Sequence, residues 1–439
     1  MKRTLIGETP NLIGQEVKLA GWVNTRRDHG KLIFIDLRDR SGVVQMVIIP
    51  DKPEAYQVAK NVRNEYVIEV TGLVKKRPGS QKKEDSLTGS VEIEASDVKI
   101  ISEVVKELPF DTAKKELDLT IPTLLDNRHL TLRNKKINDI FKIYDQVLKS
   151  YGEVMRQNGF LEIKTPKIVS AATEGGANFF KIKYFKREAY LAQSPQFYKQ
   201  AGVGAFERVF EVGPVFRAEP HYTTRHVNEY ISFDAEMGFI ESFSDIMDLL
   251  EKVMRKIIKD VEANCQGELA DYPSEFLVPS RFPRIKLTEA LEILKKEYGK
   301  ETMGVDIDPE GERLISDWAQ KNYNSDFIFL THYPVSARPF YTMPSSDPQY
   351  TESFDLIYRG VELATGGQRI HNVDQLIASI KRHRLNPKDF EDYIEIFRLG
   401  MPPHGGWGLG SERLAQKILG LKSIKEVILF PRDVRRLTP

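Results

Sequence analysis

Charged side chains and an aromatic ring gather in one short stretch, Val209 to Phe239, which reads VFEVGPVFRAEPHYTTRHVNEYISFDAEMGF. Its notable polar members are Arg217, Glu219, Arg225, His226, Tyr230 and Asp234. Both arms alternate with the period of strands, so that a polar row on each arm can face one cleft while the other face fits a core. A hairpin with its charged face in water is the common outcome of such alternation. The crowding of cations beside an aromatic ring favours a hairpin that holds a nucleotide.

A second candidate hairpin, FDLIYRGVEL, carries two carboxylates. A two-residue turn at Arg359 and Gly360 would place Ile357 opposite Glu362 and make Asp355 a diagonal neighbour on the same face. Two carboxylates that point at one place repel each other unless a cation lies between them. Magnesium prefers oxygen ligands and bridges phosphates, so the pair predicts a metal site at Asp355 and Glu362. A solvated acidic hairpin is the plainer alternative.

The elements that must position these groups fall into two patterns. Five short strands with a helix after the third occupy 15–102, which is the order of an OB barrel. Further along, amphipathic helices such as 245–261 mix with antiparallel strand pairs. We therefore expect an α+β chain with an OB-fold β-barrel at 1–103, a linker at 104–130 and an antiparallel-sheet catalytic domain at 131–439.

The composition is that of an ordinary soluble globular protein. The chain has 439 residues, of which 41% are hydrophobic and 29% are charged, and these values are typical of a soluble protein of two or three domains. No apolar run is long enough to span a membrane, and the N-terminal MKRTLIGETPNL lacks the apolar core of a signal peptide, so we expect a cytoplasmic location. A single cysteine excludes an intramolecular disulfide. With a net charge of +1, any polyanionic partner must be bound by local patches.

The predicted barrel offers groups that suit single-stranded RNA. In KLIFIDLRDR, alternation places Phe34 on the outer face between Asp36 and neighbouring polar groups, where a ring can stack on a base. Gln45 interrupts an apolar strand, and Arg26 lies on a predicted turn before Phe34, so both can contact bases or phosphates. Each is an ordinary surface residue when taken singly. Together with the barrel they favour RNA over protein or sugar.

Three segments then follow in order: FLEIKTPKI with Pro166, the 209–239 hairpin, and GWGLGSERLAQKILGL at 406–421. Together they resemble the three signature motifs of class II aminoacyl-tRNA synthetases, and the OB module in front resembles the subclass for Asp, Asn and Lys. Any one motif is weak evidence, but the ordered set is specific. The resemblance implies ATP as substrate and magnesium at Asp355 and Glu362. It also implies a homodimer through the Pro166 segment.

In this family the substrate carboxylate attacks the α-phosphorus of ATP, so positioning and charge stabilisation dominate the catalysis. The resemblance makes Arg217 the main stabiliser of the transition state, because its planar fork suits both the phosphate and the attacking carboxylate. The other implied ATP contacts are Glu219 and Tyr230 at the adenine, Arg225 and His226 at the distal phosphates, and Arg413 at the γ-phosphate and the second adenine face.

The segments YLAQSPQFYKQ at 190–200 and TGGQRI at 365–370 resemble those of the aspartyl enzymes. An anionic substrate side chain needs cations, which Lys199 and Arg369 supply, with Asp234 placed to hold Lys199. An amide side chain would leave these charges poorly matched. The asparaginyl relatives lack this lysine and carry a glutamate at the position of Asp234. Further implied aspartate contacts are Ser194, Gln196, Thr365 and, in the glycine-rich loop 171–177, Glu174.

The resemblance therefore implies ATP-dependent ligation of L-aspartate to tRNA(Asp) through an aspartyl-adenylate. The catalytic domain lacks the long bacterial insertion, as in archaeal and eukaryotic enzymes, whereas GWVNTRRDHGKLIFIDLRDRSGVVQ resembles a bacterial anticodon module. Asn24 stands where archaeal relatives use a bulky residue against tRNA(Asn), so charging of tRNA(Asn) stays open. The alternatives are an asparaginyl-tRNA synthetase, an amide-forming enzyme, and an RNA-binding regulator with an inactive catalytic domain.

Overall fold

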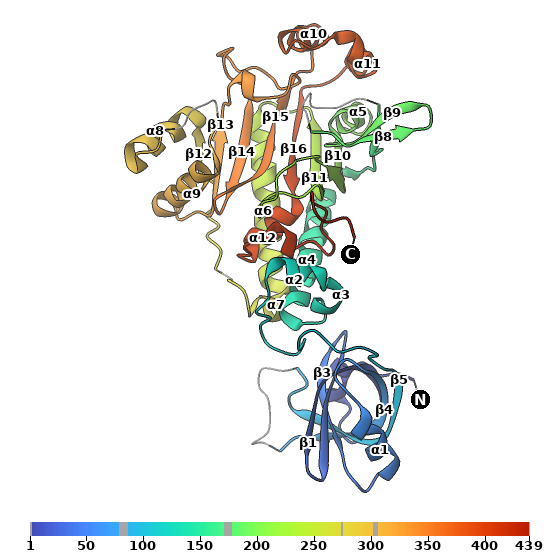
Figure 1. Ribbon diagram of the computed structural model, residues 1–439. Coiled ribbons are helices and arrows are strands. Elements are labelled where there is room, and N and C mark those ends of the chain that lie inside the picture. Colours follow the sequence, from blue (N-terminus) through green and yellow to red (C-terminus); the bar gives the residue numbers. More distant parts are fainter. Residues whose placement is uncertain (1, 79–86, 171–177, 274, 302–305, 439) are drawn as a thin grey trace. The chain divides into compact units, whose positions relative to one another are not determined.

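The computed structural model describes residues 2–78, 87–170, 178–273, 275–301 and 306–438 (Figure 1). Two compact units divide the chain: Met1–Asp118 with Arg133–Lys135, and Leu119–Leu132 with Lys136–Pro439. The segment 104–130 was expected to be a linker. Its second half contains the helix α2 (Ile121–Asp126) and most of α3 (Arg128–Thr131), which group with the second unit.

The first unit contains a closed barrel with the strand order β1-β2-β3-β5-β4, in which β1 also pairs with β4. Its elements are β1 (Glu16–His29), β2 (Leu32–Asp39), β3 (Gly42–Ile48), α1 (Pro53–Asn61), β4 (Val67–Lys76) and β5 (Val91–Ser102). The predicted alternation on β2 is confirmed, because Ile33, Ile35 and Leu37 are fully buried in the barrel core. The OB-fold β-barrel, with its helix after the third strand, is therefore confirmed.

The second unit is built on an eight-stranded sheet with the order β12-β13-β14-β15-β16-β11-β10-β6. The strands are β6 (Leu161–Glu162), β10 (Arg208–Phe216), β11 (Glu229–Gly238), β12 (Arg284–Lys286), β13 (Phe327–Thr331), β14 (Ser353–Tyr358), β15 (Val361–Arg369) and β16 (His404–Gly410). The expected antiparallel pairing holds for the central strands. The two edge pairs, β12 with β13 and β10 with β6, are parallel, so the sheet is mixed.

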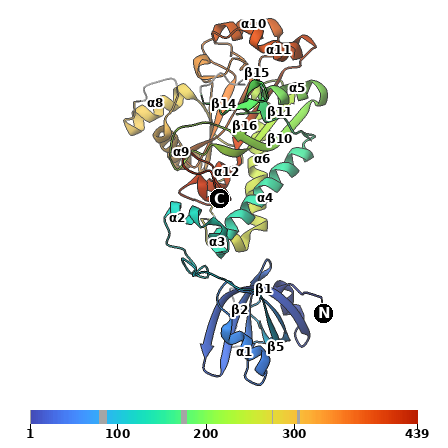
Figure 2. The ribbon, with the colours of Figure 1, turned by 45° about the vertical axis from the view of Figure 1, so that its right-hand side comes forward.

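One face of this sheet packs on two long helices, α4 (Lys135–Gln157) and α6 (Phe243–Asn264). In Figure 1 α6 runs behind the strands, and Figure 2 shows α4 and α6 side by side. The apolar side chains of β11 alternate onto this face, where Phe233 stacks on Tyr151 of α4 with ring centroids 4.0 Å apart. A capping box formed by Ser242 and Asp245 begins α6. The helix predicted at 245–261 is thus confirmed and is longer at both ends.

The opposite face carries smaller clusters and the polar row of β11. The remaining elements are β7 (Ile168–Val169), β8 (Lys181–Tyr184), β9 (Arg187–Leu191), α5 (Gln196–Phe206), α7 (Gln266–Leu269), α8 (Leu287–Tyr298), α9 (Pro309–Tyr323), α10 (Val373–Arg382), α11 (Glu391–Arg398) and α12 (Ser411–Ile418). The expectation that only one face of β10 fits a core is wrong. Phe210 enters the core on α4 and α6, while Val209 enters a second core with α10 and α11.

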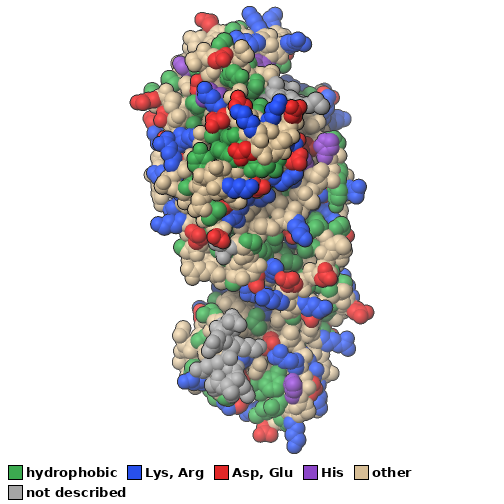
Figure 3. All heavy atoms as spheres, turned by 90° about the vertical axis from the view of Figure 1, so that its left-hand side faces the viewer, with side chains coloured by type: hydrophobic (Ala, Val, Ile, Leu, Met, Phe, Trp, Pro, Cys, Tyr) green, Lys and Arg blue, Asp and Glu red, His purple; other side chains and the backbone are tan. Residues whose placement is uncertain are grey.

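The charged side chains on the surface are of mixed sign. On the face of the second unit shown in Figure 3, Lys and Arg side chains are interspersed with Asp and Glu side chains, as the net charge of +1 leads one to expect. Within the ranges that the structure describes, no helix has both the length and the apolar character needed to cross a membrane.

Candidate active site

The nucleotide hairpin forms as predicted. Strands β10 and β11 pair antiparallel, with Glu211 opposite Asp234 and Val215 opposite Tyr230. Strand β11 then pairs with β16, whose glycines let the backbones approach closely. A Cβ at Gly406 would lie only 1.9 Å from the carbonyl oxygen of Ala235, so this position accepts no side chain. The glycines of the third motif therefore bring the polar row of β11 next to the strand that leads into α12.

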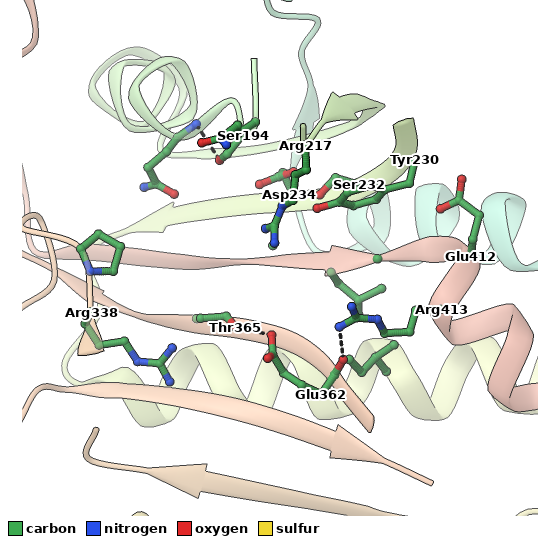
Figure 4. A pocket seen from close by; sticks show the side chains of 18 of the residues that line it. Ser194, Arg217, Tyr230, Ser232, Asp234, Arg338, Glu362, Thr365, Glu412 and Arg413 are labelled. Carbon is green, nitrogen blue, oxygen red and sulfur yellow. Dashed lines mark hydrogen bonds between the residues drawn. The ribbon is translucent and has the colours of Figure 1, made fainter. Parts of the chain in front are cut away.

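A cavity of about 350 Å³ lies over this part of the sheet (Figure 4). Its walls come from α5, the β10–β11 hairpin, β15, β16 and α12. It brings together most of the residues predicted from the sequence, which are Ser194, Gln196, Lys199, Arg217, Glu219, Arg225, His226, Tyr230, Asp234, Glu362, Thr365, Arg369 and Arg413. Glu174 lies outside the described residues. Asp355 does not line the cavity and lies next to its wall, paired with the lining residue Arg338.

At one end of the cavity, Lys199 of α5 is almost completely buried. Its Nζ lies 3.0 Å from Oδ1 of Asp234 and donates to the carbonyl oxygen of Trp407 at 2.9 Å. The predicted pairing of Asp234 with Lys199 is therefore confirmed. Glu236 adds a second carboxylate, with Oε2 3.4 Å from the same Nζ.

Arg369 of β15 completes this charged cluster. Its Nε donates to Oε1 of Glu236 at 3.0 Å, and its Nη2 donates to the carbonyl oxygen of Gly406 at 3.1 Å. Burial opposes the charge of Glu236, but Arg369 and Lys199 outweigh burial and lower the pKa of this carboxyl. Sequence reasoning missed Glu236 as a functional residue, although it shares the polar face of β11 with Asp234. Two cations and two carboxylates therefore alternate at this end.

Gln196 is the first residue of α5 and Ser194 precedes this helix by two positions, at the edge of the same cluster. The hydroxyl of Ser194 accepts from the backbone N–H of Gln196 at 3.1 Å, and Nε2 of Gln196 lies 3.5 Å from Glu236. Both side chains therefore lie beside the charged cluster, as an amino-acid site requires. Their predicted contacts with the substrate amino and carboxylate groups stay predictions.

The other end of the cavity is open. Arg217 follows directly after β10 and points into the cavity in Figure 4. Its guanidinium carbon lies 5.8 Å from the ring centre of Tyr230, and its Nη1 lies 3.9 Å from Glu219. Nε2 of His226 lies 3.3 Å from Glu219. Burial, together with neighbouring cations that include Arg413, lowers the pKa of His226 despite Glu219, so the ring is mostly neutral at pH 7.

Arg413 lies in the first turn of α12 and reaches across to β15. Its Nη1 donates to the carbonyl oxygen of Glu362 at 2.5 Å, and the hydroxyl of Thr365 donates to Oε1 of Glu362 at 2.9 Å (Figure 4). Burial opposes ionisation of Glu362, but the charge of Arg413 and the hydrogen bond from Thr365 lower its pKa. Thr365, predicted at the aspartate end, thus contacts the carboxylate predicted to hold the metal.

The acidic hairpin has the predicted turn. Arg359 and Gly360 have positive φ values of 45° and 74°, and Ile357 lies opposite Glu362. A register shift after Leu356 then pairs Asp355 with Thr365.

Asp355 has an arginine beside it, which the prediction of two facing carboxylates did not include. Its Oδ2 lies 2.8 Å from Nη2 of Arg338, a cation that sequence reasoning missed. Burial raises the pKa of Asp355 to about 6, while Arg338 opposes the rise and the charge of Glu362 adds to it. Its Oδ1 is buried and has no hydrogen-bond partner among the described residues.

The magnesium site at Asp355 and Glu362 stays a prediction. No group of three His, Cys, Asp or Glu side chains among the described residues could hold a metal ion. Magnesium bound with a nucleotide needs only one or two carboxylates, since phosphates and water supply its other ligands. Glu362 at the cavity wall and the unpartnered oxygen of Asp355 fit that requirement.

Two further carboxylates escaped sequence reasoning. Glu312 of α9 forms an ion pair with Arg225 of the β10–β11 loop, and its burial raises its pKa despite that arginine. Glu412, next to Arg413, accepts from the backbone N–H of Ile231 with both oxygens, at 2.8 and 3.1 Å. Its position beside Arg413 in GSER was a signal that the sequence offered. Glu312 gave none, because it lies far from every motif.

In the barrel unit the structure groups the predicted RNA contacts differently. Phe34 and Gln45 lie on one face of β2 and β3, where Gln45 is opposite Asp36. Arg26 lies within β1, so the predicted turn is wrong, and it is paired with Ile35, whose side chain is in the barrel core. Its Nε donates to the carbonyl oxygen of Ala59 in α1 at 3.0 Å. The arginine that pairs across from Phe34 is the next one, Arg27.

Comparison with known proteins places this geometry in a family. The model described as tRNA synthetases class II (D, K and N) matches 120–434, and an OB-fold nucleic acid binding domain matches 17–101. An aspartate–tRNA(Asp) ligase of Pyrococcus abyssi is 46% identical over 98% of both chains. An aspartate–tRNA(Asp/Asn) ligase of Deinococcus radiodurans is 43% identical over 100% of this chain and 99% of its own.

Solved structures agree with these sequence relatives. The asparaginyl-tRNA synthetase of Pyrococcus horikoshii, crystallised with asparaginyl-adenylate, superposes with a TM-score of 0.92 and 30% identity, covering 100% of both chains. An aspartyl-tRNA synthetase of Entamoeba histolytica superposes with a TM-score of 0.89 and 31% identity over 100% of this chain and 93% of its own. With its OB barrel, its three motifs and relatives that match along its whole length, the chain belongs to the class II tRNA synthetases for D, K and N, and within them to the aspartate–tRNA ligases.

Proposed function

We propose that this chain activates L-aspartate with ATP and transfers the aspartyl group to the 3′ end of tRNA(Asp). The observation that carries the proposal is the buried cluster of Lys199, Asp234, Glu236 and Arg369 at one end of a cavity whose other end carries Arg217 and Arg413. The two carboxylates balance the two cations before substrate binds. An incoming side-chain carboxylate then finds donors already held in place, with little reorganisation to reduce its affinity.

The ATP end supplies charge stabilisation. Arg217, aimed into the cavity, binds the α-phosphate and the attacking carboxylate and stabilises the charge that develops between them. Arg225 and Arg413 bind the distal phosphates, and Tyr230 supports the adenine. Magnesium that arrives with ATP would be held by Glu362 and Asp355 and would offset phosphate charge. No protein side chain needs to carry a proton in this step.

The amino-acid preference is tested first by aspartate-dependent ATP–pyrophosphate exchange, with asparagine as the competitor. We expect exchange with aspartate and at least a hundredfold less with asparagine, because an amide leaves the buried cations poorly matched. Arg369→Leu should remove aspartate-dependent exchange while MgATP binding, measured by calorimetry, persists. Arg382→Leu, an exposed arginine on α10, is the matched control and should exchange like the wild type. Exchange with asparagine alone would instead indicate the asparaginyl enzyme.

The choice of tRNA is a second question. One relative at 43% identity is named for both tRNA(Asp) and tRNA(Asn), and another at 46% is named for tRNA(Asp) alone. Charging of both purified transcripts with labelled aspartate, side by side, separates these two behaviours. Charging of tRNA(Asn) as well would mean that tRNA(Asn) is a second substrate. Charging of neither transcript, with exchange intact, would favour the amide-forming alternative.

The anticodon contacts are assigned to the barrel. Phe34 is expected to stack on a base, with Gln45 on the same face and Arg27 across from it. Phe34→Ala should lower the rate of tRNA charging and leave ATP–pyrophosphate exchange unchanged. Equal charging by the variant and the wild type would remove Phe34 from the tRNA site.

A homodimer and a cytoplasmic location complete the proposal. Leu161 and Ile168 flank Pro166 and are each 48% exposed, which favours a partner surface at this segment. A reducing compartment is compatible with a chain whose single cysteine is a free, buried thiol. Light scattering should give twice the 50.3 kDa mass of the chain, and Leu161→Asp with Ile168→Asp should give the monomer.

A further inference from the structure

Behind the aspartate end of the cavity, three polar side chains form a buried chain of hydrogen bonds that none of the motif residues explains. They come from three elements: Gln200 of α5, Tyr393 of α11 and His404 of β16. Gln200 and His404 have no exposed surface, and Tyr393 is 4% exposed. The hydroxyl of Tyr393 lies 2.9 Å from Oε1 of Gln200, and Nε2 of Gln200 lies 2.8 Å from Nε2 of His404.

The hydrogen bond of His404 at one end of this series determines which atom donates in each of the other hydrogen bonds. Nδ1 of His404 is 2.9 Å from the carbonyl oxygen of Pro402, which can only accept, so Nδ1 carries a proton. In a neutral ring Nε2 must then accept, and it accepts from the amide N–H of Gln200. The amide oxygen of Gln200 in turn accepts from the hydroxyl of Tyr393. Burial lowers the pKa of His404 to about 4, so the ring is neutral at physiological pH.

The three residues connect the elements that carry the two substrate-facing cations. Gln200 directly follows Lys199 on α5, and His404 lies opposite Arg369 in the pairing of β15 with β16. Tyr393 also stacks on Phe197 of α5, with ring centroids 4.0 Å apart. The chain of hydrogen bonds thus ties α5 to β16 directly behind the buried cluster. A small shift of α5 would move Lys199 relative to Arg369.

We propose that Tyr393, Gln200 and His404 are positioning residues that set Lys199 and Arg369 at the spacing required by the side-chain carboxylate of aspartate. This inference rests on the proposed function. The network touches neither the substrate nor ATP and acts through the two cations. The ATP end is carried by the hairpin loop and by α12, which make none of these contacts. The network should therefore govern the KM for aspartate and leave the KM for ATP unchanged.

Tyr393→Phe tests the proposal with the smallest possible change, since it removes one hydroxyl and keeps the ring stacked on Phe197. We expect the KM for aspartate in ATP–pyrophosphate exchange to rise roughly three- to tenfold, with the KM for ATP within twofold of the wild type. Tyr358→Phe is the matched control. It removes another buried tyrosine hydroxyl, one with no hydrogen-bond partner among the described residues, and should change neither constant.

Equal changes in both KM values, or no change in either, would overturn the positioning role. A loss of activity through misfolding is recognised by a loss of the thermal unfolding transition, and a milder second variant, Phe197→Leu, then tests the same junction. In it we expect the KM for aspartate to rise and the KM for ATP to hold. A rise in both would count against the proposal.

A measurement independent of activity tests the proton assignment. Nitrogen NMR of the histidine-labelled enzyme should show His404 with a protonated Nδ1 and an unprotonated Nε2. Gln200→Glu should convert the ring to the doubly protonated form, because a carboxylate at this place accepts from both neighbours. A wild-type ring protonated at Nε2 would overturn the network. Absence of aspartate-dependent exchange in the wild type would overturn the proposed function instead, and the NMR result would still decide whether the network exists.

Discussion

The two ends of the cavity are built in opposite ways. At the aspartate end the side chains of Lys199, Asp234, Glu236 and Arg369 are at most 7% exposed, and each ion pair among them is buried. At the ATP end the side chain of Arg217 is 46% exposed, and that of His226 is 37% exposed. Burial makes the first end rigid and selective, because a buried charge tolerates only a matched partner. Exposure leaves the second end able to adjust to a flexible polyphosphate and its metal.

The strongest way to break this contrast is Glu236→Gln. The change leaves Arg369 and Lys199 with one carboxylate between them in a buried site. We expect a loss of roughly 3–5 kcal/mol of stability and loss of aspartate activation. Thermal unfolding and ATP–pyrophosphate exchange measure the two effects. Glu395→Gln, which breaks an exposed pair with Arg398, should leave both unchanged. An equally stable Glu236→Gln enzyme would show that the buried cluster is not a rigid unit.

A change at the open end should separate activity from stability. Arg217→Lys keeps the charge but replaces a planar fork by a point charge, so we expect the turnover number to fall roughly a hundredfold. The melting temperature should not change, since the side chain is nearly half exposed. Single-turnover formation of aspartyl-adenylate is the measurement. A fall in melting temperature as large as that of Glu236→Gln would remove the contrast between the two ends.

A smaller effect on activity is expected from the ion pair that supports Arg225 at the ATP end of the cavity. Glu312 holds Arg225 by an ion pair from α9, so Glu312→Gln should raise the KM for ATP severalfold and leave the KM for aspartate unchanged. Glu310→Gln, on an exposed face of the same helix, is the matched control. A rise in the KM for aspartate alone would show that α9 supports the aspartate end of the cavity and not the ATP end.

The smallest effect concerns pH. Burial raises the pKa of Glu412 to about 7 from the 4.5 of an unperturbed glutamate, so the folded state binds this proton more tightly than the unfolded state. Stability from this group is therefore greatest below about pH 4.5 and declines as pH rises to about 7. The melting temperature of the wild type minus that of Glu412→Gln should be larger at pH 5.5 than at pH 8. A pH-independent difference would mean that Glu412 stays ionised throughout.

The fold was readable from the sequence where local patterns repeat. Alternation in KLIFIDLRDR gave the inside and outside of β2, and the turn at Arg359 and Gly360 gave the acidic hairpin. Local pattern failed for Arg26, because neither the length of β1 nor its pairing register is encoded within the strand itself. It also missed the register shift after Leu356 and the ion pair of Asp355 with Arg338.

The sequence by itself determined the OB barrel and the three motifs, and most of the site residues predicted from the motifs line the cavity, because each motif places its residues at fixed short spacings. Apart from the predicted pair of Lys199 with Asp234, only the tertiary structure decided which charges meet. Arg369 pairs with Glu236 from 133 positions away, and Tyr393 reaches Gln200 from 193 positions away. Such contacts depend on how strands and helices pack, and packing is a property of the whole unit. The residues that carry the chemistry were therefore predictable from the motifs, and the long-range contacts that position their side chains were not.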